Sequence, residues 1–362
     1  MKDIGEGTIR RIDWTELTPV VLLLRVFTVA PKLRVLFIAL IGLLLIFTGI
    51  SFLDPRLAEL VPQYHQGELQ FRFNFPAEVF YSLASVLLDP DFWKNPMVFL
   101  WLPCIILVGV ICSGMICRIV AVRLTIDESE STGNVLLFLR KRGMSFASAI
   151  VLSLLGILCC FLPVKIAGWM LAIPVLNYVV AILFPIPFAF TVLTLILAVV
   201  FVAGWMLLLA AVSVDGADGF DAISRMFSYI TQRPLHYLLY WLYCGILGWL
   251  GFQIIYFLTF FSIILCGKMV PADSGFFVTF WVGLFALIPR AYIFAWLWTS
   301  SVAIYLLLRR SVDATPFNEV YRVIPLNVRT LPVIKPDEHG APEIVPSAPP
   351  DTSARGSTDV QN

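Results

Sequence analysis

Long apolar runs separated by short polar segments are the main pattern of this chain. One helical crossing of the hydrocarbon core of a bilayer needs about 20 consecutive apolar residues. Runs of this length predict six spans, at residues 35–53, 96–117, 145–163, 188–212, 235–266 and 276–308. The pattern therefore predicts an all-α fold, a polytopic transmembrane helical bundle of about six spans, within a range of six to eight.

Two regions leave the number of spans open. Residues 164–186 contain two prolines, Pro174 and Pro185, and fit either a broken, partly inserted hairpin or one further span. Pro289 and Arg290 interrupt the last apolar run in the same way. Irregular backbone at membrane depth must be covered by protein, because lipid offers its polar groups no hydrogen bonds.

The polar segment 213–234 predicts an amphipathic helix at the membrane surface. Asp218 is suited to cap this helix, and Asp221 and Arg225, four residues apart, are suited to form an ion pair. Pro234 is expected to end it. Apolar residues recur every three or four positions and define one face: Phe220, Ile223, Phe227 and Ile230.

A second amphipathic segment, 122–142, has a similar layout and also follows an apolar run directly. A helix is expected over 126–142, with Val135 and Phe138 on its apolar face and its basic residues at the end. The two segments lie about 90 residues apart, each between two spans. A duplicated unit of span, amphipathic helix and span is one hypothesis for this arrangement.

Outside the spans, the pattern divides the chain into parts of different character. They are a cytoplasmic N-terminal segment (1–34), the transmembrane bundle (35–308) with an outer loop (54–95), a juxtamembrane segment (309–331), and a disordered tail rich in proline and serine (332–362). The N-terminal segment is expected to hold an interfacial helix that ends near Ala30. A last short helix is expected from Thr315 to about Arg322, and an extended piece at 68–75.

Composition supports the membrane assignment. Hydrophobic residues make up 59% of the chain and charged residues 14%, with a mean hydropathy of +0.89. Charged residues reach about a quarter of a soluble globular domain, so this class is excluded. The lipid bilayer is the expected partner, with other membrane proteins or a second copy of the chain as further partners. Nucleic acid is not expected as a partner. The formal net charge of +1 does not bear on partners, because the distribution of the charges matters more than their sum.

The distribution of basic residues predicts the orientation. Lys and Arg gather in residues 1–34, 118–144, 213–235 and from 309 onward. An even number of spans places all four groups on one side, and basic loops favour the cytoplasm. We therefore expect a multi-pass protein of the inner (plasma) membrane with both termini cytoplasmic.

Three short sequences resemble a family of proteins. Asp218-Gly-Phe-Asp-Ala-Ile-Ser-Arg225 and Tyr229-Ile-Thr-Gln-Arg-Pro234 resemble segments of uncharacterised multi-pass bacterial inner-membrane proteins. Ile304-Tyr-Leu-Leu-Leu-Arg-Arg-Ser-Val-Asp313 resembles their closing span. More distantly, the layout is similar to the membrane domain of some bacterial glycerophosphodiesterases, whose soluble catalytic domain this chain lacks. The resemblance covers about residues 10–325 and implies a fold and a location, but no activity.

The sequence holds no pattern that indicates catalysis. Its three histidines, His65, His236 and His339, are scattered without metal-ligand spacing. Nucleophile-elbow, phosphate-loop and dinucleotide motifs are missing from the sequence. We therefore predict no catalytic residue, no cofactor and no metal ligand, and we do not expect an enzyme.

A candidate motif remains, composed of Asp215, Asp218, Asp221, Arg225 and Arg290. We interpret the three aspartates as capping and first-turn charges. A divalent-cation loop is the alternative, but the closing glutamate of a calcium loop is missing. We interpret Arg290, and likewise Lys165, as a charge at a helix end that reaches toward water. A functional charge within the membrane is the alternative for both.

These patterns favour a non-enzymatic membrane scaffold whose amphipathic segments and tail contact other proteins. A transporter or channel-like protein is the alternative, motivated by the broken 145–212 region. A polar cavity lined by Lys165, Asn177 or Arg290 is what that alternative requires. A membrane enzyme is a third hypothesis, which requires Asp215, Asp218 and Arg225 to gather around a phosphate or metal.

Overall fold

A computed structural model describes residues 21–53, 64–65, 68–69, 94–174, 176–269, 275–321, 333–336 and 342–345. The chain forms two units, residues 1–321 and residues 322–362. The described secondary structure of the first unit is helical, apart from a two-stranded antiparallel pair of β1 (Tyr64–His65) and β2 (Glu68–Leu69). The expected extended piece at 68–75 is thus a strand at Glu68–Leu69, and its remainder lies outside the described residues.

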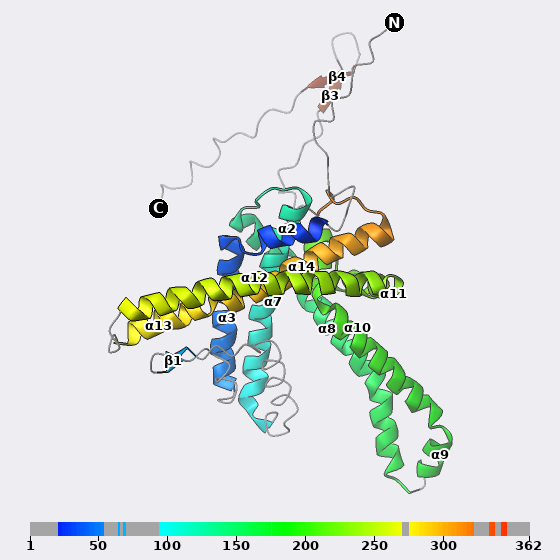
Figure 1. The fold of residues 1–362 in the computed structure, drawn as a ribbon. Helices are drawn as coiled ribbons and strands as arrows, with labels where there is room; N and C mark the ends of the chain where they lie inside the picture. The colour runs from blue at the N-terminus through cyan, green and yellow to red at the C-terminus, as the bar shows by residue number, and fades with distance from the viewer. Residues whose placement is uncertain are drawn as a thin grey trace, which may run out of the picture. The chain divides into compact units, whose positions relative to one another are not determined.

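The helices of the first unit follow the predicted apolar runs (Figure 1). They are α2 (Val21–Val29), α3 (Leu33–Leu53), α7 (Pro96–Thr125), α8 (Thr132–Leu171), α9 (Leu176–Ile182), α10 (Pro185–Asp215), α11 (Gly219–Gln232), α12 (Pro234–Met269), α13 (Gly275–Ala286) and α14 (Ile288–Asp313). Five of the described helical segments are long and apolar enough to cross a membrane, or six if α2 and α3, which meet at a bend of 70°, form one span. The protein is therefore a multi-pass membrane protein with an all-α bundle.

Three helix pairs build this unit. Helix α3 packs on α7, α8 packs on α10, and α12 packs on α14. Figure 1 shows α8 and α10 side by side, with α9 at the tip between them. Helix α14 also contacts α2, α3, α7 and α10. In the candidate span 280–313, which contains α14, 83% of the most apolar stretch is buried, against 6% in α8. The core is therefore centred on α14, whereas α8 turns most of its apolar surface outward to the lipid.

Several helices run further than the apolar pattern predicts. The span expected to end at Pro163 continues to Leu171, with Pro163 inside α8. Proline is tolerated in membrane helices because neighbouring groups satisfy the carbonyl that it leaves without a donor. Residues 164–186 are not a further span, since they comprise the end of α8, a turn and the seven-residue helix α9.

The expected separate helix over 126–142 is not present. Residues 122–125 end α7, residues 126–131 form a loop, and α8 begins at Thr132 and continues without a break into the membrane. Ser131 caps α8, because its side chain accepts a hydrogen bond from the backbone N–H of Asn134. No proline stands directly after Arg142, so α8 continues past it without a break. In the second segment Pro234 separates α11 from α12.

Glycines allow close packing between α12 and α14. A Cβ at Gly251 would lie 2.8 Å from Cζ of Tyr292, and one at Gly248 would collide with Trp296. Trp296 in turn donates from its indole nitrogen to the carbonyl of Cys244, at 3.0 Å. The two glycines therefore act in helix packing.

The second unit contains one described hairpin, β3 (Val333–Pro336) paired antiparallel with β4 (Pro342–Val345). Val333 lies opposite Val345, and Ile334 lies opposite Ile344. Part of the tail predicted to be disordered is thus paired, because β-branched residues face each other across the strands. The rest of residues 332–362 lies outside the described residues.

Candidate functional site

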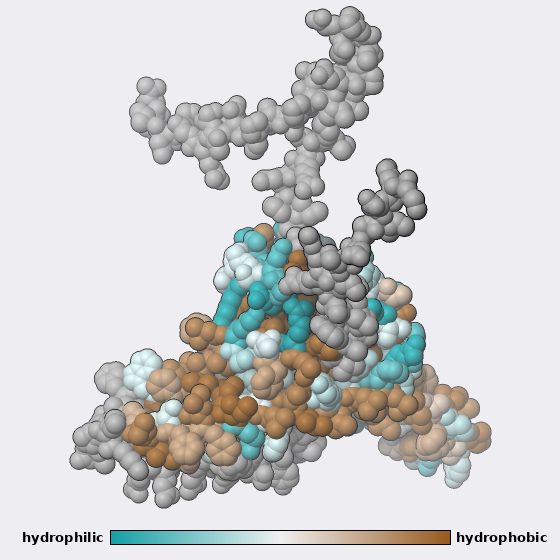
Figure 2. Space-filling model, turned by 45° about the horizontal axis from the view of Figure 1, so that its top comes forward, coloured by the Kyte–Doolittle hydropathy of each residue, from teal (hydrophilic) through white to brown (hydrophobic). Residues whose placement is uncertain are grey.

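A cluster of charged and tyrosine side chains joins the ends of α7, α10, α11 and α14. We call it the polar hub and define it as Arg118, Glu130, Asp215, Arg225, Tyr229, Tyr305, Arg309, Asp313 and Tyr321. Figure 2 shows hydrophilic residues gathered at one end of the helical unit, with hydrophobic residues over the helices beside them. The hub is the one place where several of the residues singled out from the sequence lie together within the described part of the chain.

Asp215, the last residue of α10, is the centre of one half of the hub. Its carboxylate lies 2.6 Å from Nη1 of Arg225 and 3.1 Å from Nη1 of Arg309, and it accepts a hydrogen bond from the Tyr305 hydroxyl. The Asp215 side chain is 10% exposed. Two cations and one hydroxyl therefore satisfy a nearly buried carboxylate.

Arg225 joins this carboxylate to α11. Its Nε lies 3.0 Å from the carboxylate of Asp221, so the predicted pair of Asp221 and Arg225 is present. Burial acts to lower the pKa of Arg225, but the hydrogen bond to Asp221 and the nearby charge of Asp215 outweigh it, and the pKa lies above its ordinary value. Arg225 therefore stays protonated and positively charged, and it does not act as an acid that releases a proton.

Tyr229, one turn further along α11, links that helix to the end of α14. Its hydroxyl donates to the Asp313 carboxylate, and its ring lies 5.5 Å from the ring of Tyr305. Burial, followed by the hydrogen bond to Asp313, raises the pKa of Tyr229 well above its ordinary value. The phenol stays protonated and holds α11 against α14.

Arg118 is the centre of the other half of the hub and is 1% exposed. Its Nε and Nη2 donate to the two carboxylate oxygens of Glu130, at 2.9 and 3.3 Å. Its Nη1 donates to the carbonyls of Ser213, at 3.1 Å, and Tyr321, at 2.7 Å. The guanidinium also lies 4.4 Å from the ring centre of Phe138. One buried side chain thus connects the α7–α8 loop, the end of α10 and the residues after α14.

The residues after α14, 314–321, form a strap that returns to α10. The backbone N–H of Tyr321 donates to the carbonyl of Val214, at 2.8 Å. Its ring covers Gly216, where a Cβ would lie 2.6 Å from the ring, and Gly216 has the positive φ of 63° that glycine tolerates best. The helix expected over 315–322 is not formed at its described residues, because the backbone N–H and the ring of Tyr321 contact α10 instead.

The strap is also held at its middle. Arg309 donates from Nη1 to the carbonyl of Glu319, at 2.9 Å, and its Nη2 lies 3.6 Å from the Glu319 carboxylate. Arg142 of α8 lies 5.0 Å from the centre of the Tyr321 ring. The strap therefore closes over the hub through contacts with α8, α10 and α14.

The structure brings only part of the candidate motif together. Asp215 and Arg225 lie in the hub, and Asp221 adjoins it through its ion pair with Arg225, whereas Asp218 pairs with Arg142 at 2.7 Å on the exposed surface. Asp218 occupies the capping position of α11, but its side chain makes no capping hydrogen bond. All three aspartates pair with arginines: Asp215 and Asp221 share Arg225, and Asp218 pairs with Arg142. Among the described residues no three His, Cys, Asp or Glu side chains are placed to hold a metal ion.

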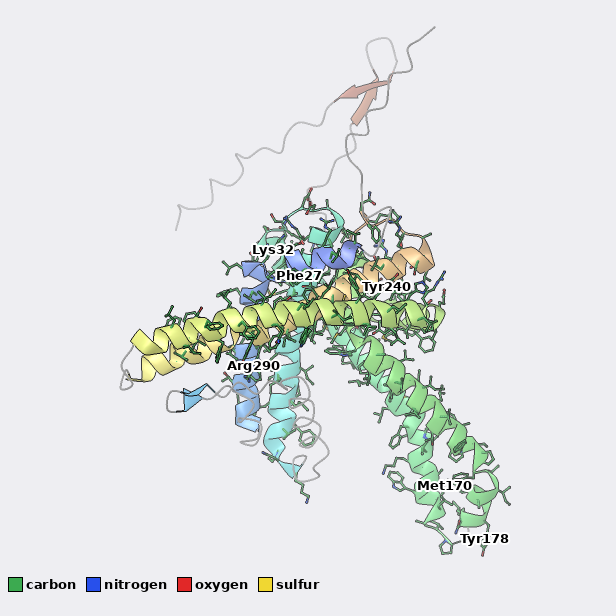
Figure 3. The ribbon with its side chains drawn as sticks, in the orientation of Figure 1. Phe27, Lys32, Met170, Tyr178, Tyr240 and Arg290 are labelled. Atoms are coloured by element: carbon green, nitrogen blue, oxygen red, sulfur yellow. The ribbon has the colours of Figure 1, made fainter. Side chains whose placement is uncertain are left out.

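Arg290 lies outside the hub, near the start of α14. Its guanidinium is 6.0 Å from the ring centre of Phe47 in α3. Lys165 and Asn177 are exposed near the α8–α10 tip, where Figure 3 labels Met170 and Tyr178 far from Arg290. The three residues that the transport hypothesis requires around one cavity are therefore not gathered.

Sequence reasoning missed most of the hub. In the sequence, Arg118 and Arg309 stand only among the basic residues that flank the spans, Glu130 carries no signal of its own, and Tyr305 lies within an apolar run. A signal was available for Arg118 in the sequence, because the four residues after it, Ile119 to Val122, are all apolar. In the structure α7 continues seven residues beyond Arg118, to Thr125. An arginine two turns inside a membrane helix needs partners.

No family model matches the chain, and no curated protein and no solved structure is similar to it at the level that such comparisons accept.

Proposed function

We propose that this protein is a non-enzymatic scaffold of the bacterial inner membrane, with both termini in the cytoplasm, and that α11 is its contact surface. The proposal rests on how α11 packs on the bundle and on which of its side chains stay exposed. Its buried face, Gly219, Ala222, Met226 and Tyr229, packs against the bundle, and its outer face carries Phe220, which is 77% exposed, and Phe227.

The mounting of α11 is rigid. Ion pairs to Asp215 and Asp221 hold Arg225, the hydroxyl of Tyr229 bonds Asp313, and Gly219 lies directly on the backbone of α8. A helix that is fixed in three places presents two phenylalanines with little conformational entropy to lose on binding, which favours recognition of a partner. The phenylalanines of the predicted apolar face therefore point away from the bundle.

The charge pairing in the hub supports a structural role. Asp215, Glu130 and Asp313 each have an identified partner, and Arg225 and Tyr229 keep their protons. The orientation rests on the basic residues. The ends of α7, α10 and α14 meet at the hub, and the basic residues of 118–144, 213–235 and 309–321 lie around these ends, which supports one shared face of the membrane, as expected of cytoplasmic loops.

In vivo photocrosslinking tests this proposal. A photoreactive phenylalanine analogue at position 220 is expected to give a discrete protein adduct, either another membrane protein or a second copy of the chain. The same analogue at exposed position 141 of α8 is the control and is expected to give none. Phe227→Asp is expected to abolish the adduct from position 220 without changing the amount of protein in the membrane. Adducts with lipid alone would mean that α11 is an interfacial anchor, and the proposal would be wrong.

A further inference from the structure

A second group of basic side chains lies where α2, α3 and α7 meet. We call it the basic cluster: Arg25 of α2, Lys32 in the turn before α3, Arg34 in the first turn of α3, and Arg123 in the last turn of α7. Figure 3 labels Lys32 at this turn. Lys32, Arg34 and Arg123 are at helix ends, which is the level of lipid headgroups in a membrane protein, and Arg25 lies in the middle of the short helix α2.

Contacts with the α7–α8 loop place these side chains together. Nη2 of Arg25 lies 3.1 Å and Nε of Arg123 lies 3.6 Å from the same oxygen of Asp127, Oδ1. Burial, followed by the nearby charge of Arg123, lowers the pKa of Lys32, and Arg25 acts in the same direction. Three cations therefore converge around one exposed carboxylate, which is 68% exposed.

Arg34 completes the cluster with an unused pair of donors. Its Nη1 donates to the backbone carbonyl of Glu130, whereas its Nε and Nη2 are buried and have no hydrogen-bond partner within the described part of the chain. These two nitrogens form the edge of the guanidinium that pairs with two oxygens of a phosphate or carboxylate at once. The carboxylate of Glu130 forms its ion pair with Arg118 and does not neutralise Arg34.

An exposed apolar stripe starts directly beside the cluster and follows α3. It is formed by Leu33, Phe37, Ile41, Leu44 and Leu45, at steps of one, three and four residues on one side of the helix. Leu33, which follows Lys32 in the chain, is 82% exposed, and Phe37 is 59% exposed. A cationic site at the headgroup level thus continues into a surface that an acyl chain can cover.

We propose that the basic cluster binds the phosphate of an anionic phospholipid whose acyl chain lies along the α3 stripe. The oxygens of the phosphate accept hydrogen bonds from Nε and Nη2 of Arg34, and Lys32, Arg25 and Arg123 complement its charge. Basic pockets between helices at the membrane surface recognise anionic lipid headgroups in this way. The site lies apart from α11, and the inference does not depend on the scaffold proposal.

Lipid titrations of the purified full-length protein in a neutral detergent test the inference, by native mass spectrometry and thermal unfolding. Phosphatidylglycerol is expected to bind and to raise the unfolding temperature, and phosphatidylcholine and inorganic phosphate are not. Lys32→Gln is expected to weaken phosphatidylglycerol binding about fivefold, the contribution of one basic residue near an anionic lipid surface. Arg34→Gln is expected to weaken it at least as much.

Arg140→Gln is the matched control, because Arg140 is an exposed arginine of α8 outside the cluster. It removes the same charge and is expected to leave binding unchanged. Lys32 makes no side-chain hydrogen bond among the described residues, so Lys32→Gln remains informative if Arg34→Gln does not fold. Equal binding of phosphatidylcholine, an equal loss in Arg140→Gln, or stabilisation by inorganic phosphate that Lys32→Gln removes would each overturn the inference. The last result would identify a soluble phosphate as the ligand.

Discussion

Arg118 shows how one buried charge can organise the end of a helical membrane protein. The cost of removing a guanidinium from water is offset only if its donors are paired, and here carboxylate oxygens and two backbone carbonyls pair with Nε, Nη1 and Nη2. The ring of Phe138 covers its face. Arg118 therefore connects segments that are up to 203 residues apart in the chain.

Arg118→Ala is expected to lower the free energy of unfolding by about 3–5 kcal/mol, since it leaves a partly buried Glu130 without its cation and two carbonyls without a donor. Unfolding of the purified protein by a denaturing detergent measures this change. Arg140→Ala, on the exposed surface, is expected to change it by less than about 0.5 kcal/mol. Equal stability of the two variants would show that the Arg118 contacts contribute nothing.

At the scale of elements, α11 depends on how closely it approaches α8. Gly219 begins α11, and a Cβ at this position would lie 2.8 Å from the backbone nitrogen of Ala149. Backbone cannot move aside as a flexible side chain can. The small residues Gly219 and Ala222 therefore face the bundle, and the larger Phe220 and Phe227 face outward.

Gly219→Ala is expected to destabilise the protein by about 1–3 kcal/mol, because the added methyl group pushes α11 away from α8. Hydrogen exchange of the α11 amides is expected to quicken in this variant. Gly168→Ala, in α8, is the control, since nothing lies within 4 Å of its added Cβ. There the change is expected to be neutral or slightly stabilising, because alanine favours helix over glycine. Slow exchange of α11 in Gly219→Ala would contradict the packing argument.

At the scale of the whole helical unit, the hub joins the ends of alternate membrane helices. Arg118 of α7 joins the α7–α8 loop to the strap after α14, and Asp215 joins the end of α10 to Arg225 of α11. Helices α8 and α10 both run from this region to the α9 tip. These contacts are consistent with six crossings, in which the first and the last span both have an end on the hub side.

Labelling with a membrane-impermeant thiol reagent, in a background without the seven native cysteines, measures this arrangement. Cysteines that replace Ser129, Ser224 and Asn318, which are exposed around the hub, are expected to react from the same side of the membrane. A cysteine that replaces Tyr178, 77% exposed near the α9 tip, is expected to react from the opposite side. Reaction of positions 178 and 224 from one side would rule out two crossings by α8 and α10.

The linear order of residues was sufficient for the membrane class, the approximate number of spans and the existence of α11. Each of these depends on local properties: the length of an apolar run, the spacing of apolar residues over a few turns, and proline as a helix terminator. The Asp221–Arg225 pair was predictable for the same reason, since four residues separate its members along one helix.

Only the tertiary structure decided which charges meet and which face of α11 is buried. Arg118 reaches Tyr321, and Asp215 reaches Arg309, across distances in sequence over which no local rule acts. Hydrophobicity alone does not say which face of α11 is buried, because in a membrane protein the apolar side chains do not have to point inward. The side of α11 that carries Gly219 is buried because only a small residue allows the backbones of α11 and α8 to lie so close. The charged side chains gather in the hub because there they pair with one another away from lipid.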